Sequence, residues 1–364
     1  MTKLCRCPPA KGLQVGVLYR LLLFSLLLYP AILWSATPAE MTAASTEQFS
    51  NPHPGADLWR AVRQREQIMT GTSQVKGVQS GVLINVYGDR WREFRMYELL
   101  PVAGYVLGGM LLFITVFYFV RGRVPVEGGL THQKLLRYSV YERMIHWFMA
   151  FIFLFLGFTG LVLLFGRSLL LPWMGPEVFS LLASASKEGH NLMGPLFLLA
   201  LVLVFIKFVR RNIYQRGDLG WLLRGGGIIG KKHVPSNFFN MGEKTMFWLL
   251  VFVGGAIGVS GLILVFPVFG QGREIMELSH VAHTIGATIM LTIIIGHIYI
   301  GTIGMEGAIE GMKTGYCDLN WAREHHDYWA KQCEQRGEVL SEQQAAANKH
   351  PPHDAASLAQ GAGK

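Results

Sequence analysis

Five long apolar stretches, separated by polar and basic segments, occupy the chain between residues 99 and 304. They are residues 99–120, 141–165, 188–209, 244–266 and 277–304. An apolar run of about 20 residues is long enough to cross a bilayer as one helix. Within the last stretch, Val281 to Thr302 contains no Asp, Glu, Lys or Arg. The pattern predicts an all-α integral membrane protein, with a four-helix transmembrane bundle at residues 141–304 and one extra transmembrane helix before it.

The first 98 residues show two further patterns. Residues 1–36 join a basic start to a mostly apolar core, Leu21 to Trp34, which is typical of a secretory signal; an uncleaved membrane anchor is the alternative. Residues 37–98 are polar and mixed in charge, and a short strand pair is expected around the turn Tyr87-Gly88-Asp89. A secretory signal would make this a short periplasmic segment, serving either as a docking surface for a partner or as a plain spacer.

Basic residues at the ends of the apolar stretches set the expected orientation. The stretches at residues 99–120 and 188–209 each end in a basic group, formed by Arg121, Arg123, Lys207, Arg210 and Arg211. Cytoplasmic loops carry an excess of Lys and Arg, so these ends are expected in the cytoplasm. The linker at residues 121–140 and the tail at residues 305–364 are then cytoplasmic. The tail is polar from Trp321 onward, and its end is expected to be frayed.

Composition agrees with a membrane protein and disfavours other classes. The chain has 364 residues, of which 51% are hydrophobic and only 16% charged, against about 25% charged residues in soluble domains. The net charge is +9, and many Lys and Arg residues lie at the ends of apolar runs. That placement favours cytoplasmic loops over nucleic-acid binding. The four cysteines lack the CxxC spacing of zinc or iron–sulfur sites.

Histidines within the apolar stretches carry the candidate chemistry. His283 and His297 lie fourteen positions apart in the last stretch. A helix of 3.6 residues per turn returns them to nearly the same face, about 21 Å apart along its axis. A single intramembrane His often packs or hydrogen-bonds between helices, but ionisable residues in membranes are costly and suggest function. Two axial haem ligands at opposite leaflets would need this arrangement.

Depth in the membrane predicts the partners of these two residues. His146 lies near the inner end of its stretch, as His297 does, and His190 lies near the outer end, as His283 does. We predict an outer haem held by His190/His283 and an inner haem held by His146/His297, both six-coordinate and suited to electron transfer. His280 either competes with His283 or lies at the interface near the outer haem. The other histidines are not assigned to haem: His53, His132, His233, His325, His326, His350 and His353.

A set of short motifs between residues 137 and 329 resembles a known family. The motifs are ERMIHW (142–147), GHNLMG (189–194), FVRRNI (208–213), GWLL (220–223), FNMGEKTMFW (239–248), HTIGA (283–287), GHIYI (296–300) and GAIEGM (307–312). Together they resemble the cytochrome b (gamma) subunit of membrane-bound respiratory formate dehydrogenase, in a wider family that includes the cytochrome b subunits of nickel–iron hydrogenases. All four predicted haem ligands lie at positions matching that family, and the extra first helix resembles the longer bacterial gamma subunits.

The resemblance implies an electron-transfer subunit in the bacterial inner membrane. Its expected cofactors are two haems b, and its expected acceptor is menaquinone or ubiquinone. Its expected partners are an iron–sulfur beta subunit and a catalytic alpha subunit with a molybdenum or tungsten pterin; no nucleic-acid partner is expected. Formate would be oxidised outside the membrane and not in this chain, and electrons would pass through the outer and inner haems to a quinone near the cytoplasmic face. The N-terminal segment would be periplasmic and the C-terminus cytoplasmic.

The motif FNMGEKT at residues 239–245 resembles the quinone pocket of that family. The resemblance assigns three residues to the quinone: Asn240, Gly242 and His297. Where short family members carry Gln, this chain has Glu243, which is either a proton relay or a helix cap favoured in a first turn. Arg143 and Lys244 are expected to pair with a haem propionate or to anchor their helices at the cytoplasmic interface.

Two other functions stay open at this point. A cytochrome b subunit of a nickel–iron hydrogenase, or of another periplasmic quinone-linked oxidoreductase, would keep both haems and change the partner. A transporter or structural anchor would hold no haem. A stand-alone enzyme is disfavoured, because no nucleophile, carboxylate pair or metal cluster appears in any apolar stretch.

Overall fold

The computed structural model describes residues 63–64, 87–215, 217–224, 234–268 and 270–349. The predicted signal at residues 1–36 and most of the outer segment lie outside these residues. The described chain forms two units. The first contains residues 103–259 and 285–349, and the second contains residues 87–102 and 260–284, in each case without the gaps given above.

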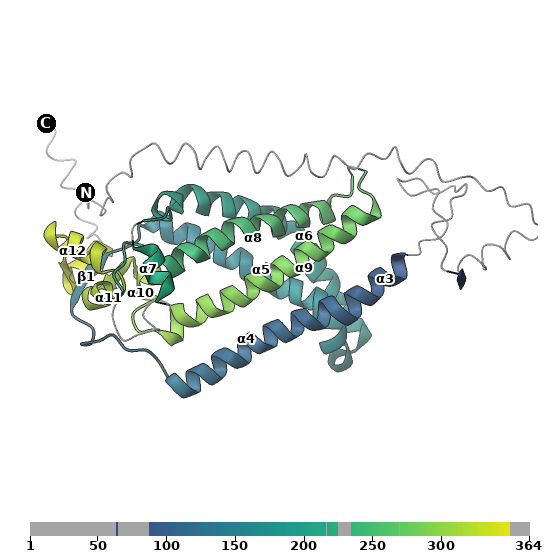
Figure 1. The fold of residues 1–364 in the computed structure, drawn as a ribbon, viewed down its shortest axis with the longest axis horizontal. Coiled ribbons are helices and arrows are strands. Elements are labelled where there is room, and N and C mark those ends of the chain that lie inside the picture. Colours follow the sequence, from purple (N-terminus) through teal and green to yellow (C-terminus); the bar gives the residue numbers. More distant parts are fainter. Residues whose placement is uncertain (1–62, 65–86, 216, 225–233, 269, 350–364) are drawn as a thin grey trace, which may run out of the picture. The chain divides into compact units, whose positions relative to one another are not determined.

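Five helices in the described part of the chain are long and apolar enough to cross a membrane: Gly88–Arg121, Val140–Leu169, Leu171–Arg211, Met241–Val265 and Arg273–Gly304. They match the five predicted stretches, so the prediction of an all-α integral membrane protein is confirmed. These helices comprise α3 (Tyr87–Glu93), η2 (Phe94–Leu99), α4 (Leu100–Arg121), α5 (Val140–Leu169), α6 (Leu171–Phe208), η3 (Val209–Arg211), α8 (Met241–Val265), α9 (Arg273–Tyr299) and η5 (Ile300–Gly304). Figure 1 labels the α-helices.

Two of these helices extend well beyond the predicted apolar stretches. The strand pair expected around Tyr87 is wrong in its described part, because α3 and η2 are helical there. Arg92 forms an ion pair with Asp89 at 3.1 Å, as residues three apart do on one face of a helix. Helix α6 begins at Leu171 and not near residue 188, with a break at Gly175, where φ is 77°. The α3–η2 extension is polar, and the first turns of α6 contain Pro172, Gly175 and Pro176, which are typical of loops.

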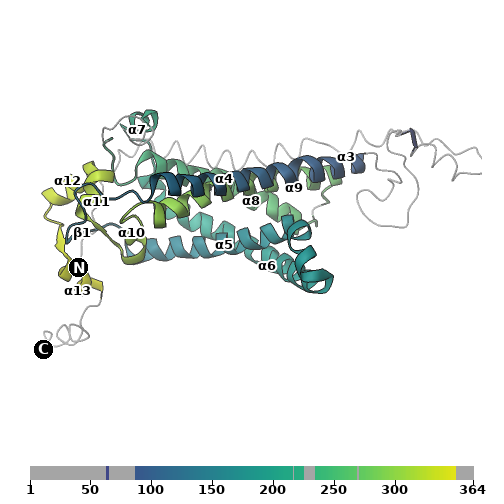
Figure 2. The same ribbon diagram turned by 90° about the horizontal axis from the view of Figure 1, so that it is seen from below.

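Helices α5, α6 and α8 run side by side in the first unit (Figures 1 and 2). Their buried contacts include Met149, Ile152, Phe197, Leu201, Val204 and Phe247. Helix α5 begins with a capping box, in which the Ser139 N–H donates to Glu142 at 2.8 Å and the Glu142 N–H donates to Ser139 at 3.3 Å. Glu142 also pairs with Arg211, beyond the end of α6, at 2.9 Å. The start of α5 is therefore tied to the end of α6.

The predicted linker and tail together form a folded layer in the first unit, which we call the sheet layer (residues 124–138 and 305–349). It contains β1 (Gln133–Leu136), β2 (Tyr316–Asp318), β3 (Leu340–Ser341), α10 (Glu310–Thr314), α11 (Leu319–His325), α12 (Asp327–Gln335) and α13 (Glu342–Lys349). The antiparallel strand order is β2-β1-β3, and Leu135 lies opposite Cys317. The tail is thus folded as far as Lys349, and its last residues lie outside the described part.

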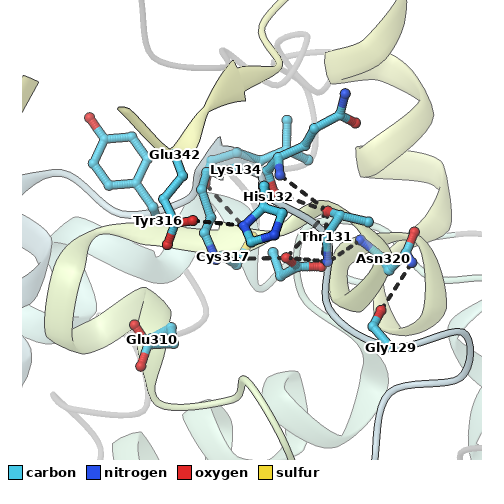
Figure 3. Close-up of polar contacts among 12 residues, drawn as sticks. Gly129, Thr131, His132, Lys134, Glu310, Tyr316, Cys317, Asn320 and Glu342 are labelled. Atoms are coloured by element: carbon cyan, nitrogen blue, oxygen red, sulfur yellow. Dashed lines mark hydrogen bonds and ion pairs between the residues drawn. The ribbon is translucent and has the colours of Figure 1, made fainter. Parts of the chain in front are cut away.

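Polar contacts across the sheet join the two parts of this layer (Figure 3). The Thr131 N–H donates to Asp318 Oδ2 at 2.9 Å, and Lys134 Nζ lies 3.6 Å from the same oxygen. Asp318 also accepts from Asn320 N and so caps α11. His132 contacts Glu342 at 2.9 Å, with its side chain 95% exposed, so it lies at the surface. These contacts fix the linker against the tail.

The stability of the sheet layer is expected to fall at high pH because Cys317 is buried. Burial raises the pKa of this thiol to about 12 and, nearby, that of Tyr138 also to about 12. The folded chain favours the neutral thiol, so its contribution to stability is complete below the ordinary pKa of 9.0 and is lost as pH rises toward about 12. The melting temperature should fall over this window less steeply in Cys317→Ala than in the parent, with Tyr138 supplying the remaining slope. If the melting temperature fell equally steeply with pH in the two proteins, the Cys317 thiol would not contribute to this pH dependence.

Candidate functional site

The structure brings His146 and His297 together in the first unit. Their ring centroids lie 6.4 Å apart, with the ring planes at 55°. A bond from a metal to an imidazole nitrogen is about 2 Å long, so two rings on opposite sides of one metal have centroids about 6 Å apart. The Nδ1 atom of His146 is buried and has no hydrogen-bond partner among the described residues. The arrangement fits one metal centre between two imidazoles, at the pair that the sequence predicts.

The start of α5 next to His146 is fixed to the sheet layer. The Trp147 indole N–H donates to the Met312 carbonyl at 3.1 Å, and Arg143 donates to the Lys313 carbonyl at 3.1 Å. One guanidinium nitrogen of Arg143 is therefore used in a hydrogen bond to the backbone of the sheet layer.

Lys244 is buried and lies 2.7 Å from Asp218. It therefore does not anchor its helix at a solvent interface.

His190 has a hydroxyl and a glycine of α5 against its ring. Thr159 Oγ1 lies 2.9 Å from His190 Nδ1. A Cβ added to Gly160 would lie 3.3 Å from His190 Cε1, so a larger residue there would require the ring to move by a few tenths of an ångström. Both neighbours come from the helix that also carries His146, and all of these residues belong to the first unit.

His283, in the second unit, has the same kind of surroundings. Ser260 Oγ lies 3.3 Å from His283 Nδ1, and a Cβ added to Gly261 would lie 3.1 Å from His283 Cε1. The nearby His280 instead packs edge-on against Trp91, with ring centroids 5.6 Å apart. Each of the two predicted outer ligands therefore has its own hydroxyl–glycine pair.

The predicted quinone motif forms the start of α8. The Glu243 N–H donates to Asn240 Oδ1 and the Asn240 N–H donates to Glu243 Oε2, both at 2.9 Å. These are the two bonds of a helix cap, so the cap interpretation of Glu243 is confirmed. Gly242 faces the short helix α7 (Asp218–Leu223), where Trp221 would lie 2.9 Å from an added Cβ. The structure thus joins Asn240 and Gly242 to Glu243 and Trp221, while His297 lies on α9 beside His146.

Two buried groups that sequence reasoning did not assign surround Glu243. Arg137 is 2% exposed, donates to Glu243 at 2.9 Å, and lies among four aromatic rings, with its Cζ 4.9–5.6 Å from each centroid. His326, 1% exposed, has Nδ1 2.8 Å from the Asn237 carbonyl and Nε2 3.7 Å from Glu243. Nothing in the sequence connects these residues, because the three lie in segments far apart along the chain.

Comparison with known proteins identifies the four-helix part. Residues 137–315 match the profile of a family described as prokaryotic cytochrome b561. This part of the chain is similar to the prokaryotic cytochrome b561 family. The matched residues contain all four predicted haem ligands, and they agree with the extent of the resemblance read from the motifs.

Curated relatives of this cytochrome b agree with the resemblance. The cytochrome b556(fdo) subunit of formate dehydrogenase from Escherichia coli (strain K12) is 26% identical over 213 residues, covering 57% of this chain and 97% of the relative. The nitrate-inducible cytochrome b556(Fdn) subunit from the same strain is 26% identical over 207 residues, covering 56% and 93%. The cytochrome b556 subunit from Haemophilus influenzae is 24% identical over 216 residues, covering 57% and 85%. The predicted similarity to these subunits is confirmed.

The match to a cytochrome b family implies haem b, and the residues of this chain fit that group. His146 and His297 have the spacing of two axial ligands, and two further histidines each have a glycine in contact with the ring. A histidine that binds a metal usually donates its second ring N–H to an oxygen. Thr159 and Ser260 offer such oxygens. These residues would therefore suit haem held between pairs of imidazoles.

A repeated pattern in this cytochrome b would have revealed the hydroxyl–glycine pairs. The segments 142–161 and 243–262 share the order Glu, a basic residue, Trp, and then a hydroxyl residue, Gly and Leu at identical spacing: ERMIHWFMAFIFLFLGFTGL and EKTMFWLLVFVGGAIGVSGL. In both segments the Glu lies in a helix cap. Comparing the two apolar stretches with each other, residue by residue, is the signal that was missed.

The close contact at Gly160 leads to a prediction about haem content. Gly160→Ala should displace the His190 ring by a few tenths of an ångström, because the new methyl group would lie 3.3 Å from Cε1, closer than an ordinary contact. We expect about half of the haem to be lost in a pyridine haemochrome assay, as one of two bis-histidine sites fails. Gly108→Ala on α4, where an added Cβ meets nothing within 4 Å, is the control. Full haem content in Gly160→Ala would show that this contact is not critical.

Proposed function

We propose that this chain is the membrane-anchoring di-haem cytochrome b subunit of a formate dehydrogenase in the bacterial inner membrane. Electrons from a periplasmic iron–sulfur subunit, supplied by a pterin-containing catalytic subunit, would enter at the His190/His283 haem and pass to the His146/His297 haem. They would then reduce a quinone near the cytoplasmic face. The observation that carries the proposal is the 6.4 Å separation of the His146 and His297 rings, and the names of the relatives support formate as the donor.

In this proposal the chain holds each redox group on two helices. Haem b, when bound, supplies reversible one-electron transfer. His283 and His297 lie fourteen residues apart on the unbroken helix α9, which separates two sites by about 21 Å along its axis. His190, His283, His146 and His297 would hold the two haems, which would leave no open position for a substrate, so this chain would conduct electrons and would not activate formate.

The quinone site is proposed at the start of α8. Asn240 and Gly242 supply a polar side chain and a small residue there, and His297 would bound the site from the inner haem. Glu243 holds the first turn of α8 through its cap, and Arg137 holds Glu243. The basic ends of α4 and α6 favour a cytoplasmic position for this site and for the sheet layer. A quinone reduced there would take up its protons from the cytoplasm.

A reduced-minus-oxidised spectrum with haem quantified per chain tests the proposal. We expect two haems b per purified chain, reducible by formate only when the partner subunits are present. A colourless chain would contradict the cytochrome assignment and favour an anchor. Two haems reduced by hydrogen, and not by formate, in the native complex would keep the di-haem core and replace the partner with a hydrogenase.

A further inference from the structure

We infer that Thr159 and Ser260 are positioning residues, which fix the ring tautomer of His190 and His283 and lower the reduction potential of the haem that these imidazoles hold. The inference rests on the proposed function, because it assumes that both histidines bind haem iron. It adds a role for two hydroxyl groups. Thr159 on α5 contacts His190 on α6, and Ser260 on α8 contacts His283 on α9.

The direction of the hydrogen bond at His190 follows from the other contacts of Thr159. Thr159 Oγ1 lies 2.9 Å from the Phe155 carbonyl and 3.2 Å from the Leu156 carbonyl. A carbonyl oxygen only accepts, so the hydroxyl proton is directed toward these backbone oxygens. The lone pair of Oγ1 is then left to accept from His190 Nδ1–H at 2.9 Å. This places the ring proton on Nδ1 and leaves the Nε2 lone pair for iron.

Burial strengthens this preference. Thr159 is 3% exposed and Ser260 is 5% exposed, so water does not compete freely for either hydroxyl. Ser260 Oγ lies 3.3 Å from His283 Nδ1, a longer contact than that of Thr159, and a smaller effect is expected from it. Gly160 and Gly261, the residues that follow the two hydroxyls, leave the rings close enough for these contacts.

A hydrogen bond at Nδ1 changes the electronic properties of the iron on the other side of the ring. An imidazole that donates from Nδ1 is a more basic ligand. A more basic ligand stabilises the ferric state relative to the ferrous state, and the reduction potential falls. At the other predicted site, His146 Nδ1 is buried with no hydrogen-bond partner among the described residues. Because His190 and His283 have a hydroxyl at Nδ1 and His146 has none in the described part of the chain, the outer haem should have a lower reduction potential than the inner haem. This order favours electron flow from the outer to the inner haem.

Redox titration of the purified holoprotein, followed by optical spectroscopy, tests the inference. In Thr159→Val the lower-potential haem should shift upward by enough to change its ferric-to-ferrous ratio about threefold, or about 28 mV at about 59 mV per tenfold change. Thr159→Ser keeps the hydroxyl and should titrate as the parent does. Thr115→Val on α4 is the matched control, because Thr115 has the same type of bond to the carbonyl four residues back, to Leu111 at 2.7 Å.

Ser260→Ala provides the second, independent variant. It should shift the same haem upward by a smaller amount. Two haems with unchanged potentials in both Thr159→Val and Ser260→Ala would overturn the inference and leave the proposed function intact. Shifts of two different haems would keep the role of the hydroxyls and contradict the pairing of His190 with His283. A parent protein without haem would refute the proposed function itself.

Discussion

His297→Ala should reduce the haem content from two to one per chain and abolish quinone reduction. The side chain lies in the last turn of α9, and its ring faces His146 at a centroid separation of 6.4 Å. Without it the proposed inner haem would lose one of its two ligands. Loss of even a residue that only hydrogen-bonds to a metal ligand commonly lowers metal affinity or activity by about 10–100-fold. We therefore expect a fall in quinone reduction of more than about 100-fold, measured with a quinone analogue in the assembled complex.

The two residues of the pair should behave alike. His146→Ala is expected to remove the same spectral component as His297→Ala, and the double variant should lose no more haem than either single one. His132→Ala is the control, since its side chain is 95% exposed in the sheet layer. Retention of both haems in His297→Ala, or loss of different haems in the two single variants, would refute this ligand pair.

The membrane helices and the His146/His297 pair were predictable from sequence for one physical reason. Lipid requires each spanning segment to satisfy its own backbone hydrogen bonds, so a long apolar run has only one common structure. Position along a helix then gives depth, and depth allowed His146 to be matched with His297 without any contact information. The start of α6 at Leu171 was missed because Pro172, Gly175 and Pro176 in its first turns are typical of a loop.

The sheet layer was not predictable by the same reasoning. Its strands have two to four residues, too few for a recognisable alternation, and β1 pairs with β2 across about 180 residues of sequence. The buried position of Arg137 likewise depends on rings from distant segments. A lone Arg between apolar stretches looks like a membrane-flanking charge, and only the fold shows that it binds Glu243.

The hydroxyl–glycine pairs show a different limit. Thr159-Gly160 and Ser260-Gly261 lie inside apolar helices, where small and weakly polar residues are common at helix contacts. Their meaning depends on which side chain faces them, and that is set by the packing of one helix against the next. A sequence read one segment at a time gives no reason to single them out.

Lys244→Met should be among the most destabilising single substitutions in the chain. Lys244 Nζ lies 2.7 Å from Asp218 Oδ2, and the two side chains are 2% and 5% exposed. Removing the cation leaves a buried carboxylate without its partner, which costs about 3–5 kcal/mol in comparable buried pairs. Asp218 also accepts from the Gln215 N–H at 2.7 Å, so the entry into α7 should loosen as well. Thermal and denaturant unfolding in detergent measure the loss.

A double substitution separates the charge from the packing. Lys244→Met combined with Asp218→Asn removes both charges and keeps an acceptor for Gln215, so more than half of the lost stability should return. Lys331→Met is the control: its partner Asp327 lies 3.9 Å away and its side chain is 65% exposed, and such surface pairs contribute about 0–1 kcal/mol. Helix α7 carries Trp221, which lies against Gly242 at the proposed quinone site. The single Lys244 variant should therefore also bind a quinone analogue more weakly. The double variant should recover this binding together with its stability. Recovery of stability without binding would place the quinone away from the start of α8.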